Sequence, residues 1–214
     1  MSEEKNSNGK NALVHDTLIL TLITIVAGAA LGGVHHITAA PIAAQEQATK
    51  EAAQKEVFAD ADSFKDLDVD ADKIASVLTE AGIDQTSVNS IAEADDASGS
   101  KVGYVVDATN NEGYGGEIEL MVGIAEGDDG LTVNGISFLV LQETAGMGMK
   151  AQEPEFKDQF NGMALGDETE IQYTKTGKSA PNEIDAISGC TVTTNAVTKA
   201  VNGALAAVES LEEG

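Results

Sequence analysis

Small and hydroxyl-bearing residues are concentrated in one stretch near the C-terminus, residues 185–193, which reads Asp-Ala-Ile-Ser-Gly-Cys-Thr-Val-Thr. Directly after it, apolar residues recur with helical spacing at Val197, Val201, Leu205 and Val208. This spacing predicts a helix over residues 191–211 with one buried face. Ser188 and Thr191 therefore lie where free backbone N–H groups and the positive end of the helix dipole stabilise an anion such as a phosphate.

The hydroxyl cluster has two interpretations. Ser188 or Thr191 can serve only as a helix cap, which is the usual role of such residues before a helix. The order Asp185-x-x-Ser188-Gly189-x-Thr191 is more particular, because it resembles the flavinylation motif Asp-x-x-Ser/Thr-Gly-Ala-Thr of the RnfG/NqrC family of membrane redox subunits. In that motif the last Thr carries FMN through a phosphoester bond. The resemblance implies covalent FMN on Thr191, with Asp185, Ser188 and Gly189 as further residues of the cofactor site.

One position departs from the family pattern, since Cys190 stands where the family usually has Ala. Both side chains are small, so we expect an FMN transferase to accept the change. A reactive thiol beside a helix N-terminus is one interpretation of Cys190, and a plain buried cysteine is the commoner one. As the chain has a single Cys, it forms no internal disulfide.

Two further stretches resemble the same family. Residues 113–116, Gly-Tyr-Gly-Gly, open a strand as in such flavin domains, and residues 143–150 are similar to their Glu-Thr-Pro-Gly-Leu-Gly segment. The glycines allow the backbone to approach a flat ligand closely, and Met147 offers it a polarisable surface. Alone, each stretch is an ordinary turn or loop. Their order and spacing make the resemblance specific, and it places these residues near the flavin: Glu143, Thr144, Met147, Gly148 and Lys150.

The composition is strongly acidic, with 12 Lys, no Arg, 36 Asp and Glu, and a formal net charge of −24. Electrostatic attraction to nucleic acid or to an anionic lipid surface is therefore excluded. The charge is uneven, because residues 51–214 hold 9 Lys against 32 acids. Simple solubility explains this acidic surface, and adaptation to salty surroundings or attraction for cations is the alternative.

A membrane anchor is predicted near the N-terminus. Residues 17–34 carry no charge and reach the length of a membrane-spanning helix, so we assign the anchor to residues 13–40. A cleaved signal peptide is the alternative, but the apolar run exceeds a typical signal core. Lys5 and Lys10 precede the span and favour a cytoplasmic N-terminus. We expect residues 1–12 to form an unstructured cytoplasmic tail.

Beyond the anchor, residues 41–58 are rich in helix-forming Ala, Gln, Glu and Lys and predict a stalk helix. Residues 59–214 then form one extracytoplasmic domain. Alternation of apolar and polar residues, with Gly/Asp/Asn turns between the segments, predicts antiparallel strands at 90–94, 102–108, 117–125, 131–141 and 171–173. A short helix is predicted at 73–81. The fold class is α+β, a single transmembrane helix followed by antiparallel strands packed with helices.

Other chemistries find no support in the sequence. Gly146-x-Gly148 lacks the third Gly of a dinucleotide fingerprint, and the segment before Gly177-Lys178-Ser179 lacks the first Gly of a P-loop. All three His lie in residues 15–36, so no Ser-His-Asp order exists. The acidic run at residues 60–72 fails as an EF-hand, because Ala71 and Val77 stand where Gly and Glu are required. We therefore predict neither a metal site nor a catalytic residue.

The resemblance implies a function for the whole chain. It indicates an electron-transfer subunit rather than a stand-alone enzyme, carrying electrons through covalent FMN in an Rnf-type ferredoxin:NAD oxidoreductase (translocase) coupled to Na⁺ or H⁺ translocation. Its partners would be the other membrane subunits and, during maturation, an FMN transferase. Two alternatives stay open: the C subunit of the Na⁺-translocating NADH:quinone oxidoreductase, and a flavin-free membrane-tethered module that binds a partner through its acidic face.

Overall fold

The computed structural model describes residues 3–127 and 130–212. It consists of two compact units, Met1–Ala48 and Thr49–Gly214, which are described separately. A single helix, α1 (Glu3–Val57), makes up the described part of the first unit and continues into the second. The prediction of an unstructured tail was wrong for residues 3–12, because the helix already begins at Glu3.

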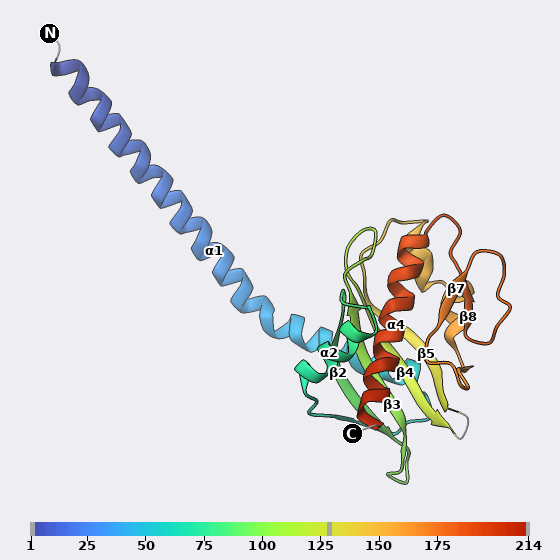
Figure 1. Cartoon of the computed structure of the whole chain (residues 1–214). Coiled ribbons are helices and arrows are strands. Elements are labelled where there is room, and N and C mark those ends of the chain that lie inside the picture. Colours follow the sequence, from blue (N-terminus) through green and yellow to red (C-terminus); the bar gives the residue numbers. More distant parts are fainter. Residues whose placement is uncertain (1–2, 128–129, 213–214) are drawn as a thin grey trace. The chain divides into compact units, whose positions relative to one another are not determined.

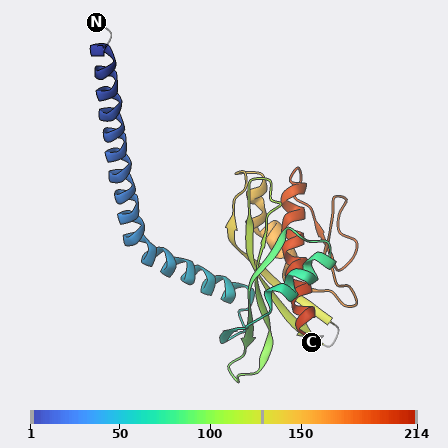
Figure 2. The same ribbon diagram turned by 60° about the vertical axis from the view of Figure 1, so that its left-hand side comes forward.

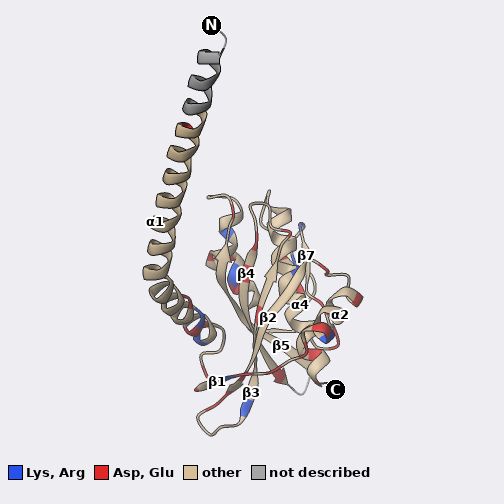
Figure 3. Cartoon of the chain, turned by 90° about the vertical axis from the view of Figure 1, so that its left-hand side faces the viewer, with Lys and Arg blue, Asp and Glu red and all other residues tan. Residues whose placement is uncertain are grey.

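The apolar part of α1 is long enough to cross a membrane. The stretch Leu13–Val57 contains an 18-residue window with a mean hydropathy of 2.2, and none of that window is buried within the chain. Figure 3 shows that most of α1 lacks charged residues, which reappear near its C-terminal end. Pro41 lies inside the helix without ending it, so the predicted anchor and stalk are parts of one continuous helix.

The second unit is built on a six-stranded antiparallel sheet whose strands follow one another in chain order (Figure 1). The strands are β1 (Ser63–Asp66), β2 (Thr86–Asp95), β3 (Lys101–Asn110), β4 (Ile118–Gly127), β5 (Gly130–Leu141) and β6 (Met163–Ala164). Each predicted strand from residue 90 to 141 coincides with one of β2 to β5. The short edge strands β1 and β6 were not predicted.

Helices and short elements complete the domain. They are α2 (Ala71–Glu80), a 3-10 helix η1 (Gly148–Gln152), α3 (Pro154–Lys157), a 3-10 helix η2 (Asp158–Phe160), and α4 (Thr191–Glu212). Two further strands, β7 (Gln172–Thr174) and β8 (Glu183–Asp185), pair in parallel as a separate small sheet. The predictions of helices at 73–81 and 191–211 and of a strand at 171–173 are confirmed. The parallel partner β8 was missed.

One face of the main sheet is covered by α4, with α2 packed beside it (Figures 1 and 2). Because successive residues of a strand point to opposite faces, alternate apolar residues of β3 and β4, such as Val106 and Leu120, meet the apolar face of α4. The four apolar α4 residues recognised in the sequence, Val197, Val201, Leu205 and Val208, are fully buried there. This core fixes the start of α4 relative to the sheet.

The opposite face of the sheet receives the last turns of α1. Val57 and Phe58 pack there against Val105 and Met121 of β3 and β4. Close approach requires Gly123, because a Cβ at that position would lie 2.5 Å from the carbonyl oxygen of Val57. The domain therefore encloses the end of α1 as part of its own core.

Candidate functional site

The segment before α4 is held by a network of hydrogen bonds around Thr194. Its buried Oγ1 accepts a hydrogen bond from the N–H of Ile187 at 3.1 Å and donates one to the carbonyl oxygen of Cys190 at 3.0 Å. Between them Gly189 adopts the left-handed conformation, with φ +78°. The chain therefore turns sharply and presents half-buried Thr191 as the first residue of α4.

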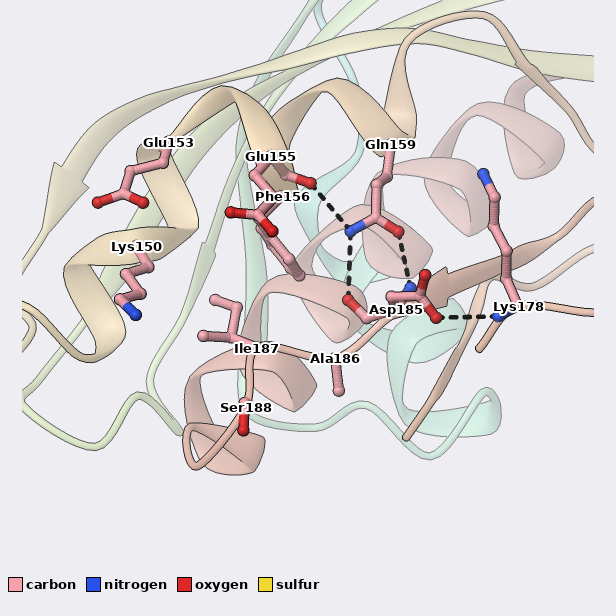
Figure 4. A pocket seen from close by; sticks show the side chains of 10 residues that line it. All are labelled: Lys150, Glu153, Glu155, Phe156, Gln159, Lys178, Asp185, Ala186, Ile187 and Ser188. Carbon is pink, nitrogen blue, oxygen red and sulfur yellow. Dashed lines mark hydrogen bonds between the residues drawn. The ribbon is translucent and has the colours of Figure 1, made fainter. Parts of the chain in front are cut away.

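Asp185 lies at the end of β8 and is bonded on three sides. Its Oδ1 accepts a hydrogen bond from the N–H of Lys178 at 2.9 Å. The side-chain amide of Gln159 makes two hydrogen bonds with the backbone of Asp185 (Figure 4). It accepts one from the N–H of Asp185 at 2.7 Å and donates one to the carbonyl oxygen of Asp185 at 3.2 Å. Asp185 thus shapes the path of the chain toward Thr191 through the neighbouring turn, rather than by capping α4 directly.

The turn that supports Asp185 is itself stabilised by a carboxylate. Glu183 accepts hydrogen bonds from the backbone N–H and the hydroxyl of Ser179, and from the N–H of Ala180. These bonds favour the ionised form and hold the pKa of Glu183 below its ordinary value. The loop between β7 and β8 therefore has a defined conformation next to the start of α4.

A pocket of about 440 Å³ lies beside Thr191. It is formed by the turn after β3, the loop after β5 and the start of α4. Six of the residues that the sequence singled out line it: Glu143, Thr144, Met147, Gly148, Gly189 and Thr191. The three segments recognised separately in the sequence therefore meet at one place, and the pocket volume is within the range of about 300–1,000 Å³ typical of small-molecule sites.

The rim of this pocket is apolar although the domain is acidic. Within residues 58–127 and 130–212, the large apolar side chains that stand exposed are Tyr114, Met147 and Val192, with 76%, 51% and 49% of their surface accessible. All three line the pocket. Exposed apolar side chains gathered at one place indicate a binding surface, and an aromatic ring with a thioether suits a flat ring system.

The remaining three predicted residues lie elsewhere. Lys150, Asp185 and Ser188 line a neighbouring hollow of about 410 Å³ together with Lys178 and buried Phe156 (Figure 4). Consecutive residues connect the two hollows, since Ser188 lines one and Gly189 lines the other. The structure therefore separates Lys150 from the pocket at Thr191. The second hollow has a mixed charge, because Glu153, Glu155 and Asp185 line it beside the two lysines.

Four residues of the Thr191 pocket were not selected from the sequence: Tyr114, Cys190, Val192 and Thr193. A signal existed for Thr193, because it stands four residues before Val197 and so belongs to the buried face of the predicted helix. Tyr114 was visible as part of the glycine-rich turn, but nothing local showed which way that turn faces. Among the described residues, no group of three or more His, Cys, Asp or Glu could hold a metal ion.

The residues of the Thr191 pocket fit FMN. A threonine hydroxyl at a helix N-terminus can carry a phosphate, whose charge the helix dipole and free N–H groups stabilise. The apolar rim beside it suits the isoalloxazine ring, and no arginine is present anywhere in the chain to hold a freely dissociating phosphate.

Comparison with known proteins gives a consistent family assignment. Residues 113–206 match the model of the FMN-binding domain, and residues 1–57 match the model of the RnfG N-terminal region. The G subunit of the Na⁺-translocating ferredoxin:NAD⁺ oxidoreductase complex of Acetobacterium woodii is 34% identical, over 92% of this chain and 91% of that protein. The G subunit of the proton-translocating ferredoxin:NAD⁺ oxidoreductase complex of Clostridium ljungdahlii is 30% identical over 100% of both chains.

A second group of relatives matches a smaller part of the chain. The C subunit of the Na⁺-translocating NADH-quinone reductase of Pasteurella multocida is 44% identical, but over 32% of this chain and 28% of that protein. This shorter similarity spans 73 residues, whereas the similarity to the G subunits extends over most of the chain.

Proposed function

Since this chain belongs to the family of Rnf complex G subunits, we propose that it is the membrane-anchored flavoprotein subunit of an Rnf-type ion-translocating ferredoxin:NAD⁺ oxidoreductase. The observation that carries the proposal is the pocket at Thr191, where all three family-like segments meet within the matched FMN-binding domain. We assign FMN to a phosphoester on Thr191 Oγ1.

Attachment requires a separate FMN transferase that uses FAD. Thr191 Oγ1 would accept the FMN phosphoryl group as the pyrophosphate bond of FAD breaks, with AMP as the leaving group and the threonine proton released. The chain contributes position rather than acid–base chemistry: the Thr194 network and left-handed Gly189 hold Thr191 at the helix start. We place Asp185, Ser188 and Lys150, which line the adjacent hollow, on the surface that the transferase recognises.

When bound, FMN supplies the reversible acceptance and donation of electrons. Tyr114, Met147 and Val192 would provide an apolar surface for the ring, and Thr144 would offer it a hydroxyl. Tethering keeps the local concentration of the cofactor high regardless of the supply outside the membrane. The chain therefore works as a carrier between redox partners within the complex.

We place the domain on the extracytoplasmic side of the membrane, with α1 as a single-pass anchor. The apolar stretch of α1 and the match of residues 1–57 to the RnfG N-terminal region support the anchor. Lys5 and Lys10 before the span favour the proposed orientation. The C subunit of the NADH-quinone reductase is the second candidate, and the smaller extent of its similarity disfavours it.

The experiment is the intact mass of the purified chain, measured under denaturing conditions after co-expression with an FMN transferase. We expect one FMN adduct on the native chain and on Thr191→Ser, and none on Thr191→Ala. Cys190→Ala, which restores the residue usual in the family, serves as a matched control that keeps the hydroxyl. A flavin adduct on Thr191→Ala would show that another residue carries the cofactor, and a native chain without flavin that stays unmodified as Cys190→Ala would favour the flavin-free module.

A further inference from the structure

The Glu143 carboxylate lies between the three segments that form the Thr191 pocket. Its Oε1 accepts hydrogen bonds from the N–H of Tyr114 at 2.9 Å and from Oγ1 of Thr193 at 2.8 Å. These partners stand 29 and 50 residues away in the sequence and belong to the turn after β3 and to the first turn of α4. One oxygen atom therefore joins two of the segments that line the pocket.

The backbone of Gly148, in the loop after β5, also lies close to the Glu143 carboxylate. A Cβ at Gly148 would lie 2.6 Å from Oε2 of Glu143 and 2.8 Å from Oγ1 of Thr193. Both distances are too short for any side chain, so the backbone of Gly148 packs directly on the pair. Glu143 is half-buried and Thr193 is 2% exposed, which protects their hydrogen bond from competition with water.

We infer that Glu143 is a positioning residue: it fixes the spacing between the Tyr114 turn and the start of α4, and thereby the orientation of the ring tethered to Thr191. The inference rests on the proposed function. It gives a specific role to Glu143, which the sequence placed near the flavin. The polar contacts of its carboxylate are made with the protein chain.

A tether alone does not orient the ring, because the phosphoester and ribityl bonds between Thr191 and the ring rotate freely. Orientation requires walls at a fixed distance. Tyr114 stands on a turn with glycines on both sides, and its side chain is 76% exposed. The bonds from its N–H and from the Thr193 hydroxyl to Glu143 therefore link this turn to the helix that begins with Thr191.

The required property of residue 143 is an acceptor at Oε1 rather than a charge. Glu143→Gln keeps a carbonyl oxygen that accepts both hydrogen bonds, whereas Glu143→Ala removes it. Thr193→Val keeps the shape of the buried side chain and removes one of the two donors, so it tests the same contact with little change in packing. Glu80→Ala, at the exposed end of α2, removes a carboxylate away from the pocket and is the matched control.

The first measurement uses the full-length chain without flavin and follows hydrogen exchange of the Tyr114 amide. We expect exchange at least tenfold faster in Glu143→Ala than in the native chain, and rates close to native in Glu143→Gln and Glu80→Ala. Unchanged exchange in Glu143→Ala would overturn the inference, because the turn would then be held without the carboxylate.

The second measurement uses the flavin-loaded chain, with intact mass confirming one adduct per chain. In Glu143→Ala and Thr193→Val we expect full loading on Thr191 but a loss of at least half of the visible circular dichroism and of the fluorescence anisotropy of the flavin, with Glu143→Gln restoring both. Native signals in a loaded Glu143→Ala overturn the inference and leave the proposed function intact. If neither the native chain nor Cys190→Ala takes up flavin, the proposed function is overturned, and the inference with it.

Discussion

At the scale of single residues, Thr191 differs from the other threonines of its helix only through its surroundings. Thr193, Thr194 and Thr198 are all buried, and each donates its hydroxyl to a protein oxygen. Thr191 is half-buried beside an open pocket. For the proposed attachment, selectivity among four similar hydroxyls follows from packing and hydrogen bonding, which bury the other three threonines and engage their hydroxyls.

A substitution at Gly148 tests how closely the backbone packs against Glu143 and Thr193. In Gly148→Ala the new methyl group would meet the Glu143 carboxylate and the Thr193 hydroxyl at less than 3 Å, so one of them must move. We expect a loss of about 1–3 kcal/mol in the free energy of unfolding, measured by urea denaturation. Gly127→Ala is the control, since its Cβ would meet an oxygen at an ordinary 3.5 Å. Equal stability of the two variants would contradict the packing described for the pocket.

At the scale of elements, the site depends on how the segment from Ile187 to α4 is held. The carbonyl of Cys190 also accepts a hydrogen bond from the N–H of Thr194 at 3.0 Å, so residue 194 binds this segment through both backbone and side chain. The left-handed turn at Gly189 is enclosed within these bonds. A few contacts at the helix start therefore fix the conformation of the segment that leads to Thr191.

Thr194→Val tests how much these hydrogen bonds contribute to the free energy of unfolding. Valine keeps the shape of the side chain but leaves the buried N–H of Ile187 without its acceptor. We expect a loss of about 1–3 kcal/mol in the free energy of unfolding. Thr198→Val in the same helix is the control, because the Thr198 hydroxyl donates only to a helix carbonyl. Removal of this hydroxyl leaves no N–H group without an acceptor. A Thr198→Val variant as unstable as Thr194→Val would show that packing, rather than the hydrogen bond, matters.

Much of this arrangement could be predicted from the sequence, and the rest depends on tertiary contacts. Strands β2 to β5 and helices α2 and α4 carry long periodic patterns, so each element was located correctly, although the strand predicted at 90–94 leaves out residues 86–89 of β2. Strands β1, β6 and β8 have four, two and three residues, too few to show a period. The family-like segments located the pocket, but the turn of η1 that directs Lys150 into the neighbouring hollow has no local signal.

The end of α1 is a second element whose attachment can be tested, through Glu56. Burial alone would raise its pKa, but hydrogen bonds from Lys157 and Ser137 lower it on balance below the ordinary value of 4.5. A pKa lower in the folded state means that ionised Glu56 stabilises the fold. This stabilisation is fully present above about pH 4.5 and is lost as the pH falls through the folded-state pKa.

We therefore expect Glu56→Gln to lower the urea midpoint at pH 7, and the difference from the native chain to vanish below the folded-state pKa. The magnitude is limited, because the Glu56 side chain is 49% exposed. Glu80→Gln, an exposed carboxyl on α2, is the control and should leave the midpoint unchanged at both pH values. A difference that persists in acid would mean that Glu56 acts through its shape and not its charge.

At the scale of the whole molecule, the chain combines a helix whose apolar stretch is long enough to cross a membrane with a domain that carries a large negative charge. A domain with 32 acids against 9 Lys beyond residue 50 is repelled by anionic lipid headgroups, so the membrane segment of α1 has to supply the attachment. The family of G subunits combines the same two parts, as the matches to residues 1–57 and 113–206 show. Orientation across the membrane then decides which redox partners the flavin can meet.

That orientation can be tested by thiol labelling, because the chain has a single Cys and this residue is 8% exposed. In a Cys190→Ala background, Ala97→Cys places a thiol on the exposed turn between β2 and β3, and Ser7→Cys places one before the span. With a membrane-impermeant maleimide applied to spheroplasts, we expect labelling of residue 97 in intact cells and of residue 7 only after permeabilisation. The reverse pattern would place the domain in the cytoplasm, and labelling at neither position before permeabilisation would contradict a span between them.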